Sequence, residues 1–193
     1  WSLVGSEMCI RDSKYLDERV QEVFQNKKEE LIWFLEHRSV YTCGVNFNQK
    51  DVLDKNVKIV KTNRGGKITW HGPGQLICYF VIDISKRKKD IRKFITVIEN
   101  SIIETLKYFK ISSFSDRKNI GIWVLDKKEK KKIAAIGIRV KKWIAFHGFS
   151  LNLSNNLNSY KKIVPCGISD KGISKIDNFK KIAKDKIISR LKI

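Results

Sequence analysis

The order of apolar segments along the chain limits the possible folds more than any other feature of this sequence. Short runs rich in β-branched and aromatic residues come in clusters, and apolar stripes at helical spacing lie between the clusters. Because strands and helices do not alternate regularly, a parallel sheet built from repeated βαβ units is not expected. The pattern predicts an α+β fold with a mostly antiparallel or mixed sheet flanked by helices.

Apolar stripes predict helices at residues 15–24, 90–109 and 179–191. The middle helix is expected to begin at Asp90, because a carboxylate there accepts hydrogen bonds from the first turn and complements the helix dipole. Apolar or alternating runs predict strands at residues 31–37, 57–62, 75–84, 121–126, 132–140 and 143–153.

With 193 residues the chain has the size of one domain. No apolar run approaches the ~18 residues that cross a bilayer, so an integral membrane protein is not expected. Residues 1–13 (WSLVGSEMCIRDS) do not join the pattern of apolar segments, and we expect them to be a non-native or disordered leader to one domain at residues 14–193. No secretory signal is recognisable, which predicts a cytoplasmic location with reduced thiols.

The chain is strongly basic, because 40 Lys and Arg residues against 20 Asp and Glu residues give a net charge of +20. Such a charge attracts polyanions, namely nucleic acid, an anionic membrane or an acidic protein partner. The excess is mostly lysine and comes with abundant Ile and Asn, a composition that AT-biased coding also produces. The charge alone therefore does not select a function.

The cysteines lie far apart and form no CxxC pair, so a structural zinc site is not expected. Cys166 follows a proline and precedes a glycine, and we expect its backbone to be extended, constrained and able to approach a ligand. This thiol is a candidate nucleophile, provided that a cation, a histidine or a helix N-terminus favours its ionised form. The alternative is a structural thiol of the kind expected for Cys78, which lies inside an apolar run.

Residues 64–76 (RGGKITWHGPGQL) form a glycine-rich segment around His71. Glycines at this density let main-chain N–H groups approach a ligand, and the leading arginine can fix an anion or a carbonyl group. The segment is not a phosphate-binding P-loop, because isoleucine rather than Ser or Thr follows its glycine-lysine pair. A tight structural turn is the alternative. A second His-Gly pair, at His147, predicts a hydrogen-bonded core histidine.

Lys132 closes a run of basic residues and opens the apolar stretch IAAIG. At the head of a buried strand an amine loses part of its hydration, which suits it to act as a base. The alternative is a solvated lysine of the kind that such basic runs usually contain.

Four segments in this order, RGGKITWHGPGQL, KIAAIGIRV, HGFSLNL and VPCGI, resemble the lipoyl(octanoyl) transferase family, and EHRSVYTCG upstream is similar to the same family. The resemblance runs from Tyr15 to Ile176, and the four segments together are specific although each alone is weak. It implies a biotin/lipoate-ligase-like fold and an acyltransferase of lipoate biosynthesis at residues 14–193. This activity moves an octanoyl group from acyl carrier protein through a cysteine thioester to a lysine of a lipoyl domain.

The resemblance also implies roles for individual residues. The thioester cysteine falls on Cys166 in VPCGI, and the lysine that favours its ionised form falls on Lys132 in KIAAIG. Trp70 and Cys78 depart from the residues usual in the family, which leaves the chain-length preference of the pocket open. The implied substrate-binding residues are Arg64, Gly65, Gly66, Lys67, Ile68, Thr69, Trp70, His71, Ala135, Ile136, Gly137, Gly148, Phe149 and Ser150.

The resemblance implies no metal and no cofactor. The implied partners are octanoyl-acyl carrier protein as donor and, as acceptors, the lipoyl domains of 2-oxoacid dehydrogenase complexes and the glycine cleavage H protein. Both kinds of partner are typically acidic, so basic residues near the pocket are expected to speed association. A monomer that binds neither nucleic acid nor membrane is expected.

Two other functions agree with parts of the pattern. An ATP-dependent lipoate or biotin ligase shares the fold, but it needs a nucleotide and no cysteine nucleophile, so transfer without ATP excludes it. A nucleic-acid-binding module would use the basic surface, and a gel shift that survives physiological salt would favour it. Against it, the aromatic residues lie inside apolar strands and do not alternate with the lysine runs as a base-stacking surface requires.

Overall fold

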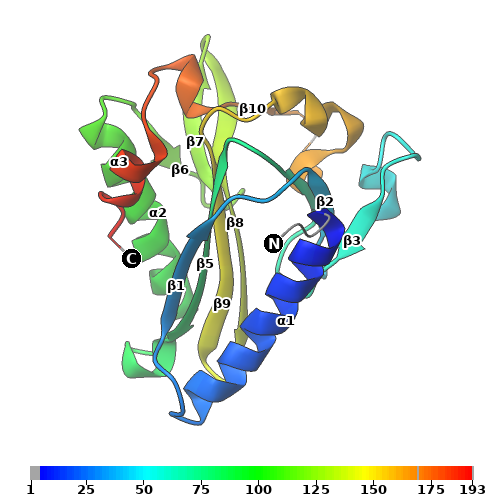
Figure 1. Ribbon diagram of the computed structural model, residues 1–193. Helices are drawn as coiled ribbons and strands as arrows, with labels where there is room; N and C mark the ends of the chain where they lie inside the picture. The colour runs from blue at the N-terminus through cyan, green and yellow to red at the C-terminus, as the bar shows by residue number, and fades with distance from the viewer. Residues whose placement is uncertain (1–4, 169, 193) are drawn as a thin grey trace.

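The computed structural model describes residues 5–168 and 170–192 and centres on one long sheet with helices against both faces (Figure 1). All neighbouring strands of this sheet are antiparallel except β10 and β8. In spatial order the strands are β1 (Leu31–Leu35), β5 (Gln75–Asp83), β9 (Ile144–Asn152), β8 (Glu129–Lys141), β7 (Ile122–Asp126) and β6 (Phe114–Ser115), with the short β10 (Gly172–Ile173) paired to β8.

A second, three-stranded sheet lies to the right of the first in Figure 1. It contains β3 (Ile59–Lys61), β2 (Val40–Cys43) and β4 (Ile68–His71), with β2 between the other two strands. β2 is parallel to β3 and antiparallel to β4. The two sheets confirm the predicted α+β fold, in which a mostly antiparallel, mixed sheet is flanked by helices.

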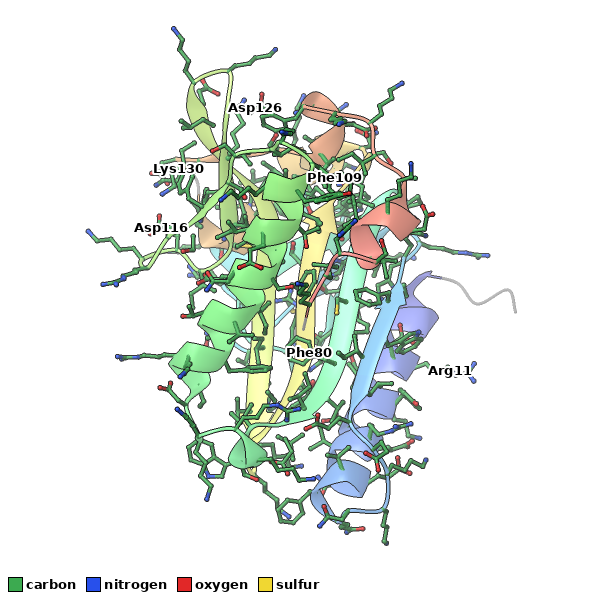
Figure 2. All side chains as sticks on the ribbon, turned by 90° about the vertical axis from the view of Figure 1, so that its left-hand side faces the viewer. Arg11, Phe80, Phe109, Asp116, Asp126 and Lys130 are labelled. Atoms are coloured by element: carbon green, nitrogen blue, oxygen red, sulfur yellow. The ribbon has the colours of Figure 1, made fainter. Side chains whose placement is uncertain are left out.

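Helix α2 (Ile91–Tyr108) covers one face of the long sheet, and Figure 2 looks onto the side of the molecule that carries it. Ile98 and Ile102 are fully buried in the same apolar core as Phe80 of β5. Burial of each such side chain contributes about 1.5–3 kcal/mol. The Asp90 side chain accepts a hydrogen bond of 2.9 Å from the backbone N–H of Lys93, which confirms the predicted start of this helix.

Helix α1 (Gly5–Phe24) covers the lower part of the opposite face, where Leu16, Val20 and Val23 pack against Val81 and Phe146. The upper part of that face is left to the small sheet and the loop that precedes β4. This division leaves space for a ligand between the two sheets, next to Ser13 of α1.

The first helix was expected to begin at residue 15, whereas the described helix begins at Gly5. Of the segment expected to be a non-native or disordered leader, residues 5–13 are therefore helical, and residues 1–4 lie outside the described residues. That residues 1–13 are non-native stays a prediction.

The C-terminal segment and one hairpin differ from the prediction. A helix was expected over residues 179–191, but only the short helix α3 (Lys184–Ile188) forms there. It follows η5 (Ile176–Asn178), one turn of 3-10 helix. Within α3 only Ile187 is buried, so this helix of five residues has a short apolar side. Strand β8 begins three residues earlier than expected, because the positive φ angles of Lys127 and Lys128 (53° and 66°) close a tight hairpin before it.

The structure also contains strands that the sequence did not reveal. β2 follows the strand expected at residues 31–37, and β4 lies inside the glycine-rich segment. In the described part of the chain, no helix combines the length and the apolar character needed to cross a bilayer.

Candidate active site

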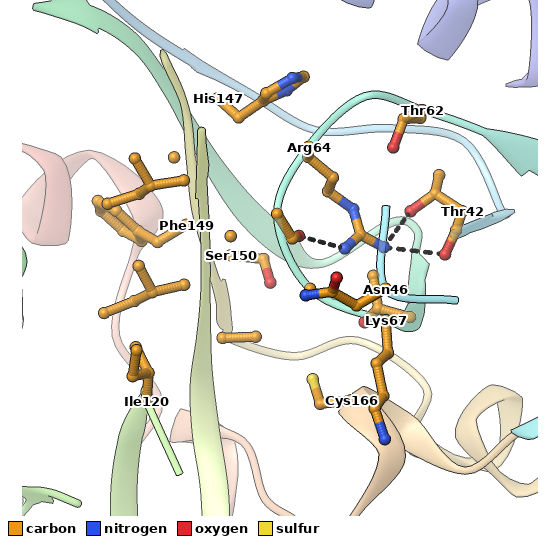
Figure 3. Close-up of a pocket in the computed structure, with 18 of the residues that line it drawn as sticks. Thr42, Asn46, Thr62, Arg64, Lys67, Ile120, His147, Phe149, Ser150 and Cys166 are labelled. Carbon is orange, nitrogen blue, oxygen red and sulfur yellow. Dashed lines mark hydrogen bonds between the residues drawn. The ribbon is translucent and has the colours of Figure 1, made fainter. Parts of the chain in front are cut away.

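A cavity of about 510 Å³ lies between the long sheet, the loop that precedes β4 and the turn that carries Cys166 (Figure 3). Its size is in the range typical of small-molecule sites. β7 pairs with β8 only as far as Ala134, so the edge of β8 beyond that residue is open to the cavity. Of the residues named from the sequence, the lining includes Arg64, Gly65, Gly66, Lys67, Thr69, His71, Lys132, Ala135, Ile136, Gly137, Gly148, Phe149, Ser150 and Cys166.

Two of the expected substrate-binding residues, Ile68 and Trp70, do not line this cavity. Successive side chains of a strand point to opposite faces, and along β4 Thr69 and His71 take the cavity side. Ile68 and Trp70 therefore pack into the separate core of the small sheet. These two residues hold β4 in place and are not among the residues that surround the cavity, so their expected role in substrate binding stays a prediction.

Cys166 lies in the 3-10 turn η4 (Pro165–Gly167), and its thiol is partly exposed. Its φ of 57° and ψ of 15° place it in the left-handed region, so the expectation of an extended backbone is wrong. Val164 takes the extended conformation instead, because the following proline disfavours the helical region. A left-handed residue other than glycine costs about 1–3 kcal/mol and persists only where the surrounding structure fixes it.

Lys132 is buried at the head of the apolar part of β8, with 5% of its surface exposed. Its Nζ donates a hydrogen bond of 2.9 Å to the carbonyl oxygen of Ile120 and lies 4.8 Å from the ring centroid of Trp123. Gly121, with a φ of 135°, makes room for this side chain, since a Cβ there would lie 3.3 Å from Nζ and 2.7 Å from the carbonyl oxygen of Ala134. The amine thus has a fixed position and little contact with solvent.

Cys166 and Lys132 also border a second, much smaller cavity of about 10 Å³. The other polar residues that line it are Thr69, Ser150, Asn152 and Tyr160. A space of this size holds about one water molecule. The thiol and the amine therefore share two cavities, although they come from segments that are far apart in the sequence.

The loop at residues 64–67 is held by the turn that follows β2. Three backbone N–H groups of this turn donate hydrogen bonds to carbonyl oxygens of the loop: residue 44 to residue 67 at 3.2 Å, residue 45 to residue 64 at 3.0 Å, and residue 46 to residue 66 at 3.1 Å. Only glycine fits at Gly44, because a Cβ there would lie 2.4 Å from the carbonyl oxygen of Gly66. This turn gives the loop a defined conformation over the sheet.

Arg64 holds the same loop from within. Its guanidinium donates to the carbonyl oxygen of Gly65 at 2.9 Å and to the carbonyl and hydroxyl oxygens of Thr42 at 2.9 and 3.1 Å (Figure 3). The sequence suggested that this arginine fixes an anion or a carbonyl group, and the carbonyl groups it holds belong to the protein itself.

The face of the sheet beneath this loop forms a trough floored by small residues. Gly137 of β8 is paired with Gly148 of β9, and Ala135 with Ser150. The loop lies directly on β8, because a Cβ on Gly65 would lie 2.4 Å from the carbonyl oxygen of Ile138. The small residues of β8 and β9 leave space between the loop and the sheet, beside Ile77 and Tyr79 of β5, and such a space suits a linear alkyl chain.

The two cavity histidines are neutral at physiological pH. Burial, followed by the neighbouring His37 and Arg64, lowers the pKa of His71 to about 3. Burial, followed by Arg64 and Arg139, lowers the pKa of His147 to about 3. His147 Nε2 lies 2.5 Å from Oδ1 of Asn63, so it is hydrogen-bonded as the sequence predicted.

His71 is oriented by a buried polar network. Gln75 uses its amide nitrogen to donate to Asn152 and Tyr160, both at 2.8 Å, so its Oε1 accepts from Nδ1 of His71 at 2.7 Å. Burial, and then the neighbouring Cys166, raises the pKa of Tyr160 above its ordinary value, so this hydroxyl is neutral. The network ties β4, β5 and β9 to the segment that leads to Cys166.

Sequence reasoning missed several residues of the cavity. Ile77 and Tyr79 of β5 line it, and their alternation with the core residues of this strand was the signal that could have found them. Lys118 and Ile120 line it from the loop before β7, where no such pattern exists in the sequence. Figure 3 shows Ile120 and Phe149 on one side of the strands, with Cys166 on the other.

Comparisons with known proteins agree on one family. The model of the lipoyl protein ligase A/B catalytic domain matches residues 12–192. An octanoyltransferase of Wolbachia pipientis subsp. Culex pipiens is 42% identical over 165 residues, which cover 85% of this chain and 80% of the relative. An octanoyltransferase of Ehrlichia chaffeensis is 42% identical over 164 residues, which cover 84% of this chain and 77% of the relative.

Solved structures share the fold at low sequence identity. Lipoate-protein ligase A with bound ATP superposes with a TM-score of 0.71 at 15% identity, over 91% of this chain and 75% of that chain. A bipartite lipoate protein ligase from Thermoplasma acidophilum gives a TM-score of 0.66 at 12% identity, over 89% of this chain and 72% of that chain. At these identities the likeness concerns the fold alone.

Proposed function

The chain belongs to the lipoyl protein ligase A/B catalytic-domain family and is an octanoyltransferase of lipoate biosynthesis, and we propose that it carries the octanoyl group on Cys166. One observation supports this proposal above all: the Cys166 thiol and the Lys132 amine border the same cavities, at the end of a trough floored by small residues. In the proposed reaction the trough holds the alkyl chain, with the thioester carbonyl next to the thiol.

In the first half-reaction, the Cys166 sulfur attacks the carbonyl carbon of the donor thioester. A new C–S bond forms to Cys166, and the C–S bond to the donor breaks. The proton of the Cys166 thiol passes by way of Lys132 to the departing donor sulfur. One thioester replaces another, so this step is nearly isoenergetic.

In the second half-reaction, the amine of an acceptor lysine attacks the carbonyl carbon of the Cys166 thioester. An amide bond forms, the C–S bond to Cys166 breaks, and the proton lost by the amine reaches the Cys166 sulfur through Lys132. An amide is more stable than a thioester, so this step runs downhill and requires no nucleotide.

The substrates are an acyl donor and lipoyl-domain proteins. For this chain we propose octanoyl-acyl carrier protein as the donor, and as acceptors the lipoyl domains of 2-oxoacid dehydrogenase complexes and the glycine cleavage H protein. Lys67 and Lys118 line the cavity, and no carboxylate does among the described residues, which agrees with acidic partners. A monomeric state and a cytoplasmic location stay predictions.

Intact-mass spectrometry after mixing with octanoyl carrier protein, without ATP, tests the proposal. The wild type is expected to gain the mass of one octanoyl group, and Cys166→Ala is expected to gain none. Cys43→Ala is the matched control: its thiol is buried in the small sheet, and the adduct should remain. An adduct that persists in Cys166→Ala, or one that forms only with ATP, would refute the proposed route and favour a ligase.

A further inference from the structure

Lys67 lies directly against the turn that carries the nucleophile. A Cβ on Gly167 would lie 2.3 Å from Nζ of Lys67 and 2.4 Å from its Cδ, so the lysine side chain occupies the space beside this glycine. Figure 3 shows the Lys67 side chain running past Cys166. Because the turn after β2 fixes the backbone at residues 64–67, Lys67 extends toward the turn that carries Cys166 from a fixed position.

The surroundings of Lys67 leave its charge available to the cavity. Among the described residues, the ion pairs do not include Lys67. Several titratable and charged groups border a cavity together with Cys166. The cations are Lys132 from β8, Lys67 and Arg64 from the loop before β4 and Lys118 from the loop before β7, and Arg64 is held by Thr42 and Gly65. The others are Tyr79 of β5, neutral His71 and His147, and neutral Tyr160.

Lys132 and Lys67 reach the region of Cys166 from different elements and in different environments. Lys132 is buried and hydrogen-bonded to a backbone carbonyl, whereas Lys67 is half-buried at the cavity wall. The half-buried amine of Lys67 keeps part of its contact with solvent, whereas the buried amine of Lys132 has little. The two lysines are thus suited to different tasks at the same sulfur.

We propose that Lys67 is a second cation at the reaction centre, which stabilises the negative charge that develops on the Cys166 sulfur and on the acyl carbonyl oxygen. The inference rests on the proposed function. Lys132 must give up and accept a proton within each cycle, so it cannot hold a constant charge. Lys67 supplies a charge that takes no part in proton transfer and stabilises both half-reactions.

Lys67→Met and Lys67→Arg test this assignment, with Lys61→Met as the control that removes one exposed charge from the same small sheet. The first measurement is the pH profile of Cys166 alkylation by iodoacetamide, without any acyl substrate. The second is single-turnover acylation by octanoyl-N-acetylcysteamine, a small uncharged thioester. The buried thiols of Cys43 and Cys78 report folding, because they stay unmodified in a folded variant.

Lys67→Met is expected to move the alkylation profile to higher pH by at least about half a unit and to slow acylation about tenfold. Lys67→Arg should stay near the wild type on both measurements, and Lys61→Met should change neither. An unchanged pH profile in Lys67→Met would overturn the inference. So would a variant that is slow with carrier protein but normal with the small thioester, since Lys67 would then only attract the carrier.

The two proposals fail in different ways. If wild-type Cys166 is alkylated but never acylated, the proposed route is wrong, while the alkylation profile still decides the role of Lys67. If wild-type Cys166 is acylated and Lys67→Met behaves like the wild type, only the inference about Lys67 is wrong.

Discussion

Lys132 combines burial with a single carbonyl partner, which suits the proton transfer proposed for its amine. The aromatic face of Trp123 and the carbonyl oxygen of Ile120 hold the side chain without neutralising it, because neither is an ion. Among the described residues, no salt bridge competes for the amine. Its position beside Gly121 also explains why no larger residue fits there.

Lys132→Met is expected to lower kcat by about 10²–10⁴-fold, because it removes a proton carrier while keeping the length and the apolar part of the side chain. Binding of octanoyl carrier protein, measured by calorimetry, should change little. Lys131→Met is the matched control, since that neighbour pairs with Glu129 and does not line the cavity. A loss of less than about threefold in kcat would exclude proton transfer through Lys132.

Much of what the sequence predicted is local. Asp90 and the apolar stripe that follows it specify α2 within one segment, and the structure contains that helix. Cys166 and Lys132, which the sequence singled out, line the same cavity, and their catalytic roles stay a proposal.

What the sequence did not reveal depends on distant partners. Strand β4 forms because β2 lies beside it, and glycines around it hid its pattern. The left-handed backbone of Cys166 is fixed by the turn in which it lies, whereas the proline before it only predicted extension. The expected C-terminal helix is shortened to α3, of which only Ile187 is fully buried, while Ile188 packs at the edge of the same core.

The trough between the loop and β8 is expected to select the length of the acyl chain. In Gly137→Ala the new Cβ would lie 3.2 Å from the carbonyl oxygen of Gly65 and 3.6 Å from Cδ of Arg64, which narrows the groove. Because Gly137 lies farther along β8 from Lys132 than Ala135 does, a long chain should be affected more than a short one. We expect kcat/KM to fall about tenfold for octanoyl, the order of effect of a small steric change in a pocket, and much less for butanoyl.

Kinetics with a series of small acyl thioesters check this prediction. The butanoyl substrate is the internal control for damage to the reaction centre. An equal loss with all chain lengths would contradict a role for the trough in holding the alkyl chain.

At the scale of the whole molecule, the neutral histidines couple stability to pH. The pKa values of His71 and His147 are about 3 in the folded protein, below the ordinary value of 6.5 that applies when the chain unfolds. The unfolded chain therefore binds more protons than the folded one below pH 6.5, and stability must fall as the pH decreases. Between its two pKa values, each histidine changes the free energy of unfolding by about 1.4 kcal/mol per pH unit.

Urea unfolding at pH 7.5, 5.5 and 4.5 measures this effect. The wild type is expected to lose stability steeply below pH 6.5, and His147→Asn should remove about one histidine's share of the slope. Asparagine suits this position because His147 has a φ of 68°, which Asn tolerates better than most residues. A slope that is the same in the variant and the wild type would contradict the buried neutral state.

The net charge of +20 is expected to act on association with protein partners. Raising the ionic strength from about 50 to 500 mM should lower kcat/KM severalfold with octanoyl carrier protein, because salt screens attraction between a basic enzyme and an acidic partner. The uncharged small thioester is the control and should show a flat profile. If kcat/KM does not depend on ionic strength with either donor, the net charge has no part in association and is explained by coding bias.

Transfer of the octanoyl group through Cys166 is tested most directly by asking whether the isolated octanoyl-enzyme passes its acyl group to the acceptor. The octanoyl-enzyme is isolated, mixed with a lipoyl domain without ATP or donor, and followed by mass spectrometry on the millisecond-to-second scale. We predict that the group leaves Cys166 and appears on the acceptor lysine with a rate constant at least equal to kcat. An octanoyl-enzyme that keeps its acyl group while the complete mixture turns over would contradict the account.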